Sequence, residues 1–376
     1  MFVMSQIDLA VIGAGFAGLA CAQAASLRGL RVVVLDRRPC AGHMPHTTGL
    51  LVKEVADAWD IPRGITRKIH GVRLYSPALR SIDLVRGGYY FLATDTARMM
   101  RWWSGQASLA GADVRYGNAF TAATVGASGL EIHGLKVRAR YLVGADGARS
   151  RVAQAMGLGV NRRFLVGVEA EFKGVKRIDE DMLHVFIDPQ LAPGYIGWVV
   201  PGVRITQVGL ACRTGHGVGL EKFLAKVARV FDFSEAQEMD RRGGLIPVGG
   251  PVSPMSRSGA MVIGDAAGLV SPLTAGGIHT ALQCGRTAGL AVSDHLLDAG
   301  HDPARAVRAS VPSFFFKRML RAAWEMPLPA GLFDAALGSP VLRAAAQTIF
   351  FHNRGLLSFN TWRDVAGAVW DRLAET

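Results

Sequence analysis

The stretch "IDLAVIGAGFAGLACAQAASLRGLRVVVLDRR" constrains the fold of this chain more than any other. Residues 7–12 are an apolar run that predicts a buried parallel strand, and Gly13, Gly15 and Gly18 follow it. The first glycine permits a tight turn, the second lets a pyrophosphate approach the backbone, and the third lets helix and strand pack closely. A predicted helix and a second strand ending in Asp36, whose carboxylate can accept ribose hydroxyls, complete a dinucleotide-binding unit.

Two later segments indicate FAD rather than a nicotinamide cofactor alone. "VRARYLVGADGARSR" (137–151) and "GAMVIGDAAGLVSPLTAGG" (259–277) each place an Asp-Gly or Gly-Asp pair at the end of a predicted strand. The carboxylate of Asp265 can bond a ribityl hydroxyl, and the Gly276-Gly277 backbone at a helix start can stabilise negative charge on a reduced flavin ring. A simple NAD dehydrogenase needs neither segment.

The three segments, in this order, resemble FAD-dependent oxidoreductases of the p-hydroxybenzoate hydroxylase type and, within them, the geranylgeranyl reductase family. The resemblance implies an α/β fold: a Rossmann-like FAD-binding domain of the glutathione reductase type, an inserted antiparallel β-sheet substrate domain and a helical C-terminal region. The expected divisions are an FAD-binding domain over 1–69, 93–158 and 255–300, a substrate domain over 70–92 and 159–254, and a helical cap over 301–376.

The resemblance also implies which residues contact FAD. The expected set is Gly13, Gly15, Phe16, Ala17, Gly18, Asp36, Arg37, Arg98, Phe120, Asp146, Gly264, Asp265, Pro272, Gly276, Gly277 and Ile278. Asp36 and Arg37 belong to the adenosine side, and Asp265 to the ribityl chain. For Arg98, near the start of a helix, a solvated side chain is the alternative. Arg149 and Arg151 are expected anion contacts, and NAD(P)H or reduced ferredoxin is the expected electron donor.

Between these segments, alternating runs predict a mostly antiparallel sheet. The runs are "GVRLYS", "RSIDLV", "GYYFLA", "FLVGVEAEFKG", "DMLHVFID", "YIGWVVPG" and "VRITQVGLACR". The stretch "GYIGWVVP" (194–201) resembles the Tyr-x-Trp-x-Phe-Pro stretch of the reductase family, although Tyr195 stands one position early and Val200 replaces the Phe. Tyr195 and Trp198 are therefore candidates for catalytic contacts, and burial in the sheet core is the alternative.

Three functions remain open on this scaffold. We expect an FAD-dependent reduction of carbon–carbon double bonds in a polyprenyl or other apolar substrate, with hydride delivered from reduced flavin. The alternatives are an NAD(P)H- and O₂-dependent aromatic monooxygenase and a flavin-binding protein without turnover. Halogenation is disfavoured, because Ile196 stands where the halogenases carry the first Trp of Trp-x-Trp-x-Ile-Pro.

The loop "PCAGHMPHTTGLLVKE" (39–54) places Cys40, His43 and His46 at intervals of three residues. A zinc site is one interpretation, although no further ligand supports it, and we expect no metal. The resemblance favours a cofactor-side loop, since the reductases carry a Cys-x-Gly-Gly loop that runs toward the flavin. Cys40 and His46 are then candidates for tuning the site or donating a proton. A helix is expected after Thr48, with its hydroxyl as the cap.

Charge and cysteine content suggest the surroundings of the protein. The net charge of +12 favours anionic lipid or phosphorylated ligands, because no nucleic-acid motif is present and the arginines are spread along the chain. Four scattered cysteines and no basic signal region fit a reducing cytoplasm, and no charge-free apolar run reaches 18 residues. The oligomeric state is not predicted.

The C-terminal part combines aromatic residues with basic ones at helical spacing. "VPSFFFKRMLRAAWEMPLP" and "VLRAAAQTIFFHNRGLLSF" contain Lys317, Arg318, Arg321, Arg343 and Arg354. One interpretation is an apolar face in a lipid interface, with the basic residues near headgroups. The other is a cap that buries its aromatic residues against the substrate domain.

Overall fold

The computed structural model describes residues 5–127, 129–133, 137–298, 300–311, 314–325 and 329–351. The chain forms two compact units. The first comprises residues 1–45, 96–164 and 246–318, and the second comprises 46–95, 165–245 and 319–376. Residues 46–69 thus group with the second unit, whereas the expected domain boundaries placed them with the FAD-binding segments.

The first unit is built on an eight-stranded sheet with the order β17-β18-β11-β1-β2-β8, extended by β10 on β11 and β9 on β10. Its central strands are parallel, as the sequence predicts for the dinucleotide-binding unit. The strands are β1 Ser5–Ile12, β2 Val32–Leu35, β8 Asp113–Arg115, β9 Ala123–Gly126, β10 Gly129–Ile132, β11 Val137–Gly144, β17 Ser256–Arg257 and β18 Ala260–Val262.

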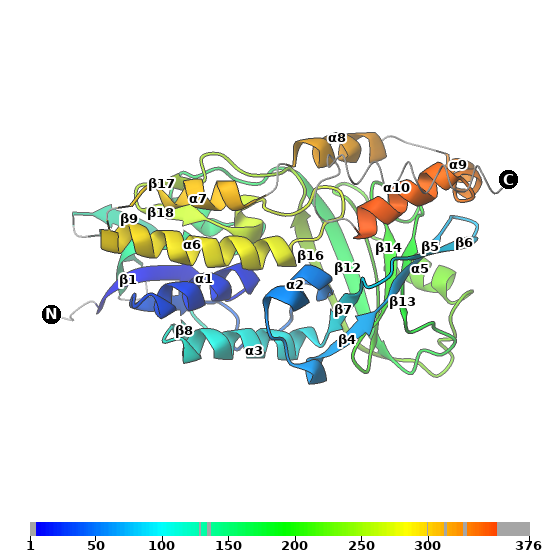
Figure 1. The fold of residues 1–376 in the computed structure, drawn as a ribbon, viewed down its shortest axis with the longest axis horizontal. Coiled ribbons are helices and arrows are strands. Elements are labelled where there is room, and N and C mark those ends of the chain that lie inside the picture. Colours follow the sequence, from blue (N-terminus) through cyan, green and yellow to red (C-terminus); the bar gives the residue numbers. More distant parts are fainter. Residues whose placement is uncertain are drawn as a thin grey trace. The chain divides into compact units, whose positions relative to one another are not determined.

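Two helices of this unit, α1 and α6, lie side by side (Figure 1). Glycines make their close approach feasible: a Cβ on Gly285 would lie 2.2 Å from the carbonyl oxygen of Ala17, and one on Gly289 would lie 2.3 Å from that of Cys21. The first and last motif segments are thereby joined. The helices of the unit are α1 Phe16–Leu27, α3 Thr96–Leu109, α4 Arg151–Ala155, the 3₁₀ turn η2 Gly264–Ala267, α6 Ile278–Asp298 and α7 Pro303–Ser310.

The second unit contains a seven-stranded sheet with the order β16-β12-β15-β14-β13-β5-β6. The antiparallel arrangement is confirmed for the pairs β12–β15, β15–β14, β14–β13 and β5–β6, whereas β13 and β5 run parallel. Strand β16 was not predicted, because its sequence "QEMDRRGGLIP" alternates poorly. The strands are β5 Gly71–Tyr75, β6 Ser81–Val85, β12 Phe164–Lys173, β13 Met182–Phe186, β14 Gly197–Pro201, β15 Thr206–Arg213 and β16 Gln237–Pro247.

A smaller sheet in the same unit corrects two expectations. Its strands are β3 Leu50–Val52, β4 Thr66–Ile69 and β7 Phe91–Thr94, in the order β3-β7-β4. The run "GYYFLA" therefore contributes to this sheet rather than to the large one. The helix expected after Thr48 begins only at Lys53 (α2 Lys53–Ala58; the 3₁₀ turn η1 Arg63–Ile65 follows), because Leu50–Val52 pair with β7.

The two faces of the large sheet bury different partners. Val199 and Val200 are consecutive in β14 and so point to opposite faces. On the face of Val199, the helix α5 Leu220–Val227 packs through Phe223. On the face of Val200, Leu337 and Phe351 from the C-terminal segment join the core. The C-terminal helices are α8 Phe315–Trp324, α9 Ala330–Ala336 and α10 Pro340–Phe351.

The C-terminal basic residues have different surroundings. Arg343 donates a hydrogen bond to the carbonyl oxygen of Asp83 in β6, at 2.9 Å, and Arg321 is buried. Phe315 and Met319, in contrast, are 69% and 56% exposed on α8. Arg354 lies outside the described residues. No helix in the described ranges is long and apolar enough to cross a bilayer.

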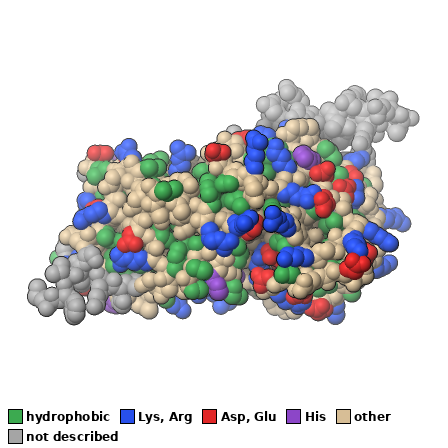
Figure 2. All heavy atoms as spheres, turned by 90° about the horizontal axis from the view of Figure 1, so that it is seen from below, with side chains coloured by type: hydrophobic (Ala, Val, Ile, Leu, Met, Phe, Trp, Pro, Cys, Tyr) green, Lys and Arg blue, Asp and Glu red, His purple; other side chains and the backbone are tan. Residues whose placement is uncertain are grey.

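On the face seen in Figure 2, Lys and Arg side chains form several separate groups, and Asp and Glu side chains lie among them. This distribution agrees with the spread of arginines along the sequence. On this face, it gives no continuous basic stripe of the kind that follows a nucleic-acid backbone.

Candidate active site

The three glycines in the turn between β1 and α1 have different roles. A Cβ on Gly13, whose φ is +106°, would lie 2.3 Å from the carbonyl oxygen of Ala145, and one on Gly18 would lie 1.9 Å from that of Gly13. These two glycines are required by the packing of the chain itself. A Cβ on Gly15 would meet nothing within 4 Å. Helix α1 begins at Phe16 without a side-chain cap, so its first N–H groups face this open space and suit an anion.

Asp36, at the end of β2, is buried, and both of its carboxylate oxygens accept hydrogen bonds from the protein. Its carboxylate accepts hydrogen bonds from the backbone N–H of Ala14 at 2.7 Å, the backbone N–H of Arg38 at 2.8 Å, and the Arg38 guanidinium at 2.9 and 2.7 Å. Burial alone raises the pKa of this carboxyl, but the bonds and charge of Arg38 outweigh burial and lower the pKa below its usual value. A ribose hydroxyl reaches Asp36 only by replacing one of these donors.

The arginine beside Asp36 is therefore Arg38, whereas the sequence analysis selected Arg37, which is exposed. Sequence reasoning missed Arg38 because both arginines follow the strand and only the geometry of the turn distinguishes them. The expected role of Arg37 on the adenosine side stays a prediction.

Asp146, at the end of β11, caps a short helix. Its carboxylate accepts hydrogen bonds from the hydroxyl of Ser150 at 2.6 Å and from the backbone N–H groups of Arg151 at 2.7 Å and Val152 at 3.1 Å. Asn161, which the sequence did not single out, joins this segment to the next one. Its side-chain amide donates to the carbonyl oxygens of Ala148, at 3.0 Å, and Asp265, at 2.8 Å.

Asp265 differs from both of these carboxylates. It follows β18 in the turn η2, and burial raises the pKa of its carboxyl to about 6. No hydrogen bond to this carboxylate comes from the residues that the structure describes. A Cβ on Gly277 would lie 3.5 Å from its Oδ1, and one on Gly264 would lie 2.8 Å from the Cβ of Ala17. The first and third motif segments therefore meet at an acceptor that has no hydrogen-bond donor among the described residues.

These features fit a dinucleotide with a pyrophosphate and a polyol chain. The open N-terminus of α1 at Gly15 can hold the phosphates, and Asp265 can accept hydroxyls of a ribityl chain. Of the other expected contacts, Pro272 and Phe120 are buried, Gly276 and Arg98 are exposed, and Ile278 begins α6. Contact with FAD by each of these residues stays a prediction.

The loop after β2 packs on the start of α3. A Cβ on Gly42, whose φ is +76°, would lie 2.3 Å from the carbonyl oxygen of Ala97. Cys40 is exposed on this loop, whereas His46 belongs to the second unit, where it is also exposed. No group of three or more His, Cys, Asp or Glu side chains within the described ranges could hold a metal ion. The suggested roles of Cys40 and His46 stay predictions.

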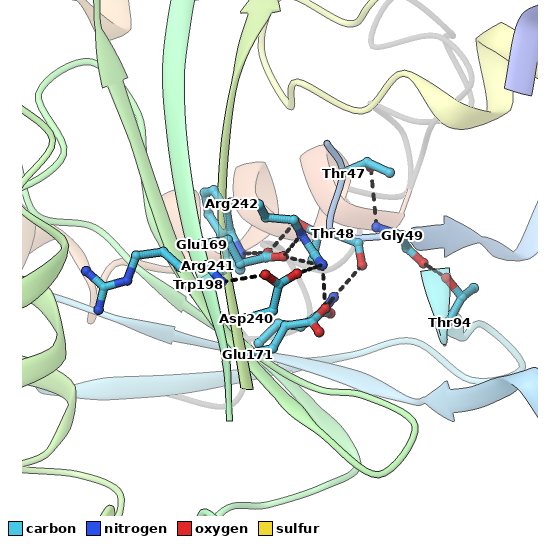
Figure 3. Close-up of polar contacts among 11 residues, drawn as sticks. Thr47, Thr48, Gly49, Thr94, Glu169, Glu171, Trp198, Asp240, Arg241 and Arg242 are labelled. Atoms are coloured by element: carbon cyan, nitrogen blue, oxygen red, sulfur yellow. Dashed lines mark hydrogen bonds and ion pairs between the residues drawn. The ribbon is translucent and has the colours of Figure 1, made fainter. Parts of the chain in front are cut away.

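Trp198 is held by a buried polar network in the second unit (Figure 3). Its indole N–H donates to Oε2 of Glu169 at 2.7 Å, and the hydroxyl of Thr48 donates to the same oxygen at 2.6 Å. The other oxygen of Glu169 accepts hydrogen bonds from Nε and Nη2 of Arg242 at 3.1 and 2.6 Å. The indole lies against Gly209, where a Cβ would come within 2.6 Å of its ring.

The network continues beyond Glu169. Nη1 of Arg242 lies 2.6 Å from Oε1 of Glu171, and the side-chain amide of Gln207 donates to the carbonyl oxygen of Thr48 at 2.9 Å. The side chains of Arg242 and Glu169 are only 5% and 6% exposed. Burial alone lowers the pKa of Arg242, but the charges of Glu169 and Glu171 outweigh burial and raise it. Such a pair holds its geometry firmly, because breaking it leaves a buried charge unpaired.

Tyr195 lies elsewhere in the second unit. It is buried, and it borders a cavity of about 370 Å³ whose lining does not include Trp198. Burial raises the pKa of its hydroxyl. The two predicted catalytic residues of this stretch therefore have separate surroundings, and their catalytic roles stay predictions. Glu169 and Arg242 could not be singled out from sequence patterns, because the network joins strands that are distant in the chain.

Comparison with known proteins identifies the family. A family model described as FAD dependent oxidoreductase matches residues 8–92, and one described as FAD binding domain matches residues 104–207. Digeranylgeranylglycerophospholipid reductase 2 of Methanopyrus kandleri is 30% identical over 311 residues, which cover 76% of either protein. The chain belongs to the geranylgeranyl reductase family. Within this family, the digeranylgeranylglycerophospholipid reductase of Methanocaldococcus jannaschii is 26% identical over 75% of each chain.

Solved structures agree with the fold of the family. A geranylgeranyl bacteriochlorophyll reductase-like protein from Thermoplasma acidophilum matches with a TM-score of 0.82 at 20% identity, covering 97% of this chain and 96% of that one. The flavin-dependent brominase Bmp2 matches with a TM-score of 0.69 at 15% identity, covering 99% and 100%. As a geranylgeranyl reductase family member, the chain is an FAD-dependent oxidoreductase with the expected Rossmann-like fold.

Proposed function

We propose that this enzyme reduces carbon–carbon double bonds in the polyprenyl chains of a lipid. The observation that carries the proposal is the 30% identity, over 76% of the chain, to a protein named as a digeranylgeranylglycerophospholipid reductase. FAD, when bound, supplies the hydride chemistry that such a reduction needs. The protein binds the cofactor and the lipid chain, excludes water, and supplies a proton to the second alkene carbon.

On the cofactor side, two features prepare the chain for binding. The open turn at Gly15 leaves the first N–H groups of α1 for a pyrophosphate. The carboxylate of Asp265 is available to accept hydroxyl donors, and these donors would lower the pKa that burial raises to about 6. Binding of a polyol chain therefore favours the ionised form of Asp265.

On the substrate side, we assign Trp198 as a fixed apolar surface for the prenyl chain. Its indole is held by the bond to Glu169 and by contact with Gly209, so little motion is left to it. Cys40 and His46 are the candidates for proton donation. Cys40→Ala should lower turnover while FAD stays bound, and unchanged turnover would reduce Cys40 to a packing role. We expect NAD(P)H or reduced ferredoxin as the electron donor.

We further expect contact with the membrane surface through helix α8. Phe315 and Met319 stand one turn apart and are 69% and 56% exposed, and Arg318 lies between them. An exposed apolar pair beside a cation suits the interface of an anionic bilayer. Sedimentation with vesicles that contain anionic lipid tests this contact: Phe315→Glu with Met319→Glu should abolish it, and equal sedimentation of this variant would contradict it.

The reaction itself is tested without oxygen. The photoreduced enzyme is mixed anaerobically with a geranylgeranyl lipid, and the flavin absorbance is followed. Oxidation of the flavin at a rate that depends on lipid concentration supports the proposal. If the flavin stays reduced until air enters, and an aromatic compound then stimulates NADPH consumption, the enzyme is a monooxygenase instead.

A further inference from the structure

The cavity beside Tyr195 is lined by Arg213, and Arg321 lies near Tyr195 behind the lining; the proposed reaction uses neither arginine. Its volume is about 370 Å³, and its lining includes Tyr195, Arg213, His216, Trp324, Glu325 and Phe333. The walls come from the loop before β14, the end of β15 and the C-terminal segment, all within the second unit. The lining combines aromatic side chains with cationic and hydrogen-bonding groups.

Arg321 stands behind this lining, at the C-terminal end of α8. It is 2% exposed, and its guanidinium carbon lies 5.8 Å from the ring centroid of Tyr195. Its Nε donates to Oε1 of Glu325 at 2.8 Å. Its Nη1 and Nη2 are buried and have no hydrogen-bond partner in the part of the chain that the structure describes.

Arg213, the last residue of β15, lines the cavity directly. Its side chain crosses Gly194, where φ is +77° and a Cβ would come within 2.8 Å of the Arg213 Cγ. Its Nη1 donates to the backbone carbonyl oxygen of Glu325 at 3.2 Å. Its Nε is buried and likewise lacks a partner among the described residues.

The charges around Glu325 do not balance. A guanidinium stays charged at every physiological pH, and a buried charge without a partner is strongly unfavourable. Arg321 pairs with the carboxylate of Glu325, whereas Arg213 reaches only the backbone carbonyl oxygen of Glu325 and forms no ion pair with the described residues. Three buried N–H-bearing nitrogens and one positive charge are left for another group to satisfy.

We propose that this cavity binds a phosphate group, with Arg213 and Arg321 as its cationic contacts. Guanidinium groups suit phosphate because their planar N–H pairs match two of its oxygens. The identification of this phosphate as the headgroup of the prenyl lipid rests on the proposed function. Free inorganic phosphate is the other source of the same chemistry.

The binding site is tested without turnover, on the FAD-loaded protein. Inorganic phosphate, added at constant ionic strength, should raise the thermal unfolding midpoint of the wild type by several degrees. Arg321→Met should lose this shift, and without phosphate it should be less stable than the wild type, because its buried ion pair with Glu325 is broken. If Arg321→Met does not fold, Arg213→Met serves as the second variant.

The control is Arg318→Met, which changes an exposed arginine on the same helix and should keep the phosphate shift. A wild type that does not respond to phosphate would overturn the proposal. Variants at Arg213 and Arg321 that both keep the full response would also overturn it.

The source of the phosphate is tested by turnover. A prenyl phospholipid and the matching prenyl alcohol are compared as substrates. The wild type should have a lower KM for the phospholipid than for the alcohol. Arg213→Met should raise the KM for the phospholipid about tenfold or more, which is the loss expected for a charge-assisted contact. The kcat and the KM for the alcohol should stay the same. Equal KM values for both lipids would contradict the headgroup assignment. A phosphate shift that depends on Arg321, combined with no reduction of any lipid, would uphold the site and reject the proposed function.

Discussion

The two compact units use their polar groups in opposite ways. In the first unit, the carboxylate of Asp265 accepts no hydrogen bond from the described residues, and α1 begins without a side-chain cap. In the second unit, Glu169 accepts hydrogen bonds from Trp198, Thr48 and Arg242. An open set of polar groups gains its partners from a ligand, whereas a closed network fixes the side chains of the protein itself. The first arrangement fits cofactor binding, and the second fits the positioning of an aromatic side chain.

The largest effect is expected at the glycine turn, where packing and ligand binding can be separated. Gly18→Ala places a Cβ 1.9 Å from the carbonyl oxygen of Gly13, so the turn must distort. We expect a loss of about 3 kcal/mol or more in the free energy of unfolding, comparable to overpacking of a tight core. Thermal or denaturant unfolding of the cofactor-free protein measures it.

Gly15→Ala is the matched control, since its Cβ meets nothing within 4 Å and its φ is −87°. It should leave the cofactor-free protein within about 0.5 kcal/mol of the wild type, the range of a neutral substitution. It should nevertheless weaken FAD binding, because the methyl group occupies the space assigned to the phosphates. Unchanged FAD affinity in Gly15→Ala would place the pyrophosphate elsewhere.

The closed network is tested by removing a glutamate partner from each of two neighbouring arginines, the buried Arg242 and the more exposed Arg241. Glu169→Ala leaves the Arg242 guanidinium, 5% exposed, with one fewer carboxylate, and should cost about 3 kcal/mol of stability, as for other broken buried pairs. Glu221→Ala removes one of the two carboxylate partners of the adjacent Arg241; Glu221 is 73% exposed, and the loss should be less than about 1 kcal/mol. Urea unfolding of both variants measures the difference, and equal losses would mean that the buried network contributes no special stability.

The open carboxylate is tested by pH. Burial raises the pKa of Asp265 from its usual 3.8 to about 6, so the folded cofactor-free chain holds this proton more tightly than the unfolded chain does. Stability from this group is therefore present below about pH 4 and is lost as the pH rises through about 6. Asp265→Asn cannot ionise and should escape the loss. The difference between the unfolding midpoints of the variant and the wild type should therefore rise with pH over this range. A difference that is constant with pH would contradict the raised pKa of Asp265.

Within the network, a smaller effect is expected at Thr48. Thr48→Val keeps the shape of the side chain and removes the donor that lies 2.6 Å from Glu169. Because Glu169 keeps its bonds to Trp198 and Arg242, we expect a loss of only about 1 kcal/mol, the usual net value of one hydrogen bond. Equilibrium unfolding measures this loss, and one as large as that of Glu169→Ala would show that Thr48 is the main anchor of the network.

The fold of the first unit could be predicted because its demands are local and steric. At Gly13 and Gly18, a Cβ atom would lie less than 2.5 Å from a nearby backbone oxygen, so only glycine fits at these positions. The convergence of Gly264 and Asp265 on the same region follows from parallel strands, whose carboxyl ends meet at one edge of a sheet. Sequence spacing carries this information directly.

The polar contacts could not be predicted, because they depend on turn geometry and on the pairing of strands that are distant in the sequence. Arg38 rather than Arg37 pairs with Asp36, as a result of the turn after β2. Arg242 belongs to β16, whose sequence is typical of a charged loop. It pairs with Glu169 because β16 lies beside β12 in the sheet. Thr48 was expected to cap a helix and instead donates to Glu169.

The central claim, that this flavoenzyme reduces an isoprenoid double bond, is tested most directly by the mass of the lipid after one anaerobic turnover. The photoreduced, FAD-loaded protein is incubated with one equivalent of a geranylgeranyl lipid, and the recovered lipid is measured by mass spectrometry. We predict a gain of two hydrogen masses for each double bond reduced, with no oxygen incorporated. Recovery of unchanged lipid without oxygen, together with an oxygenated product once air is admitted, would contradict this account.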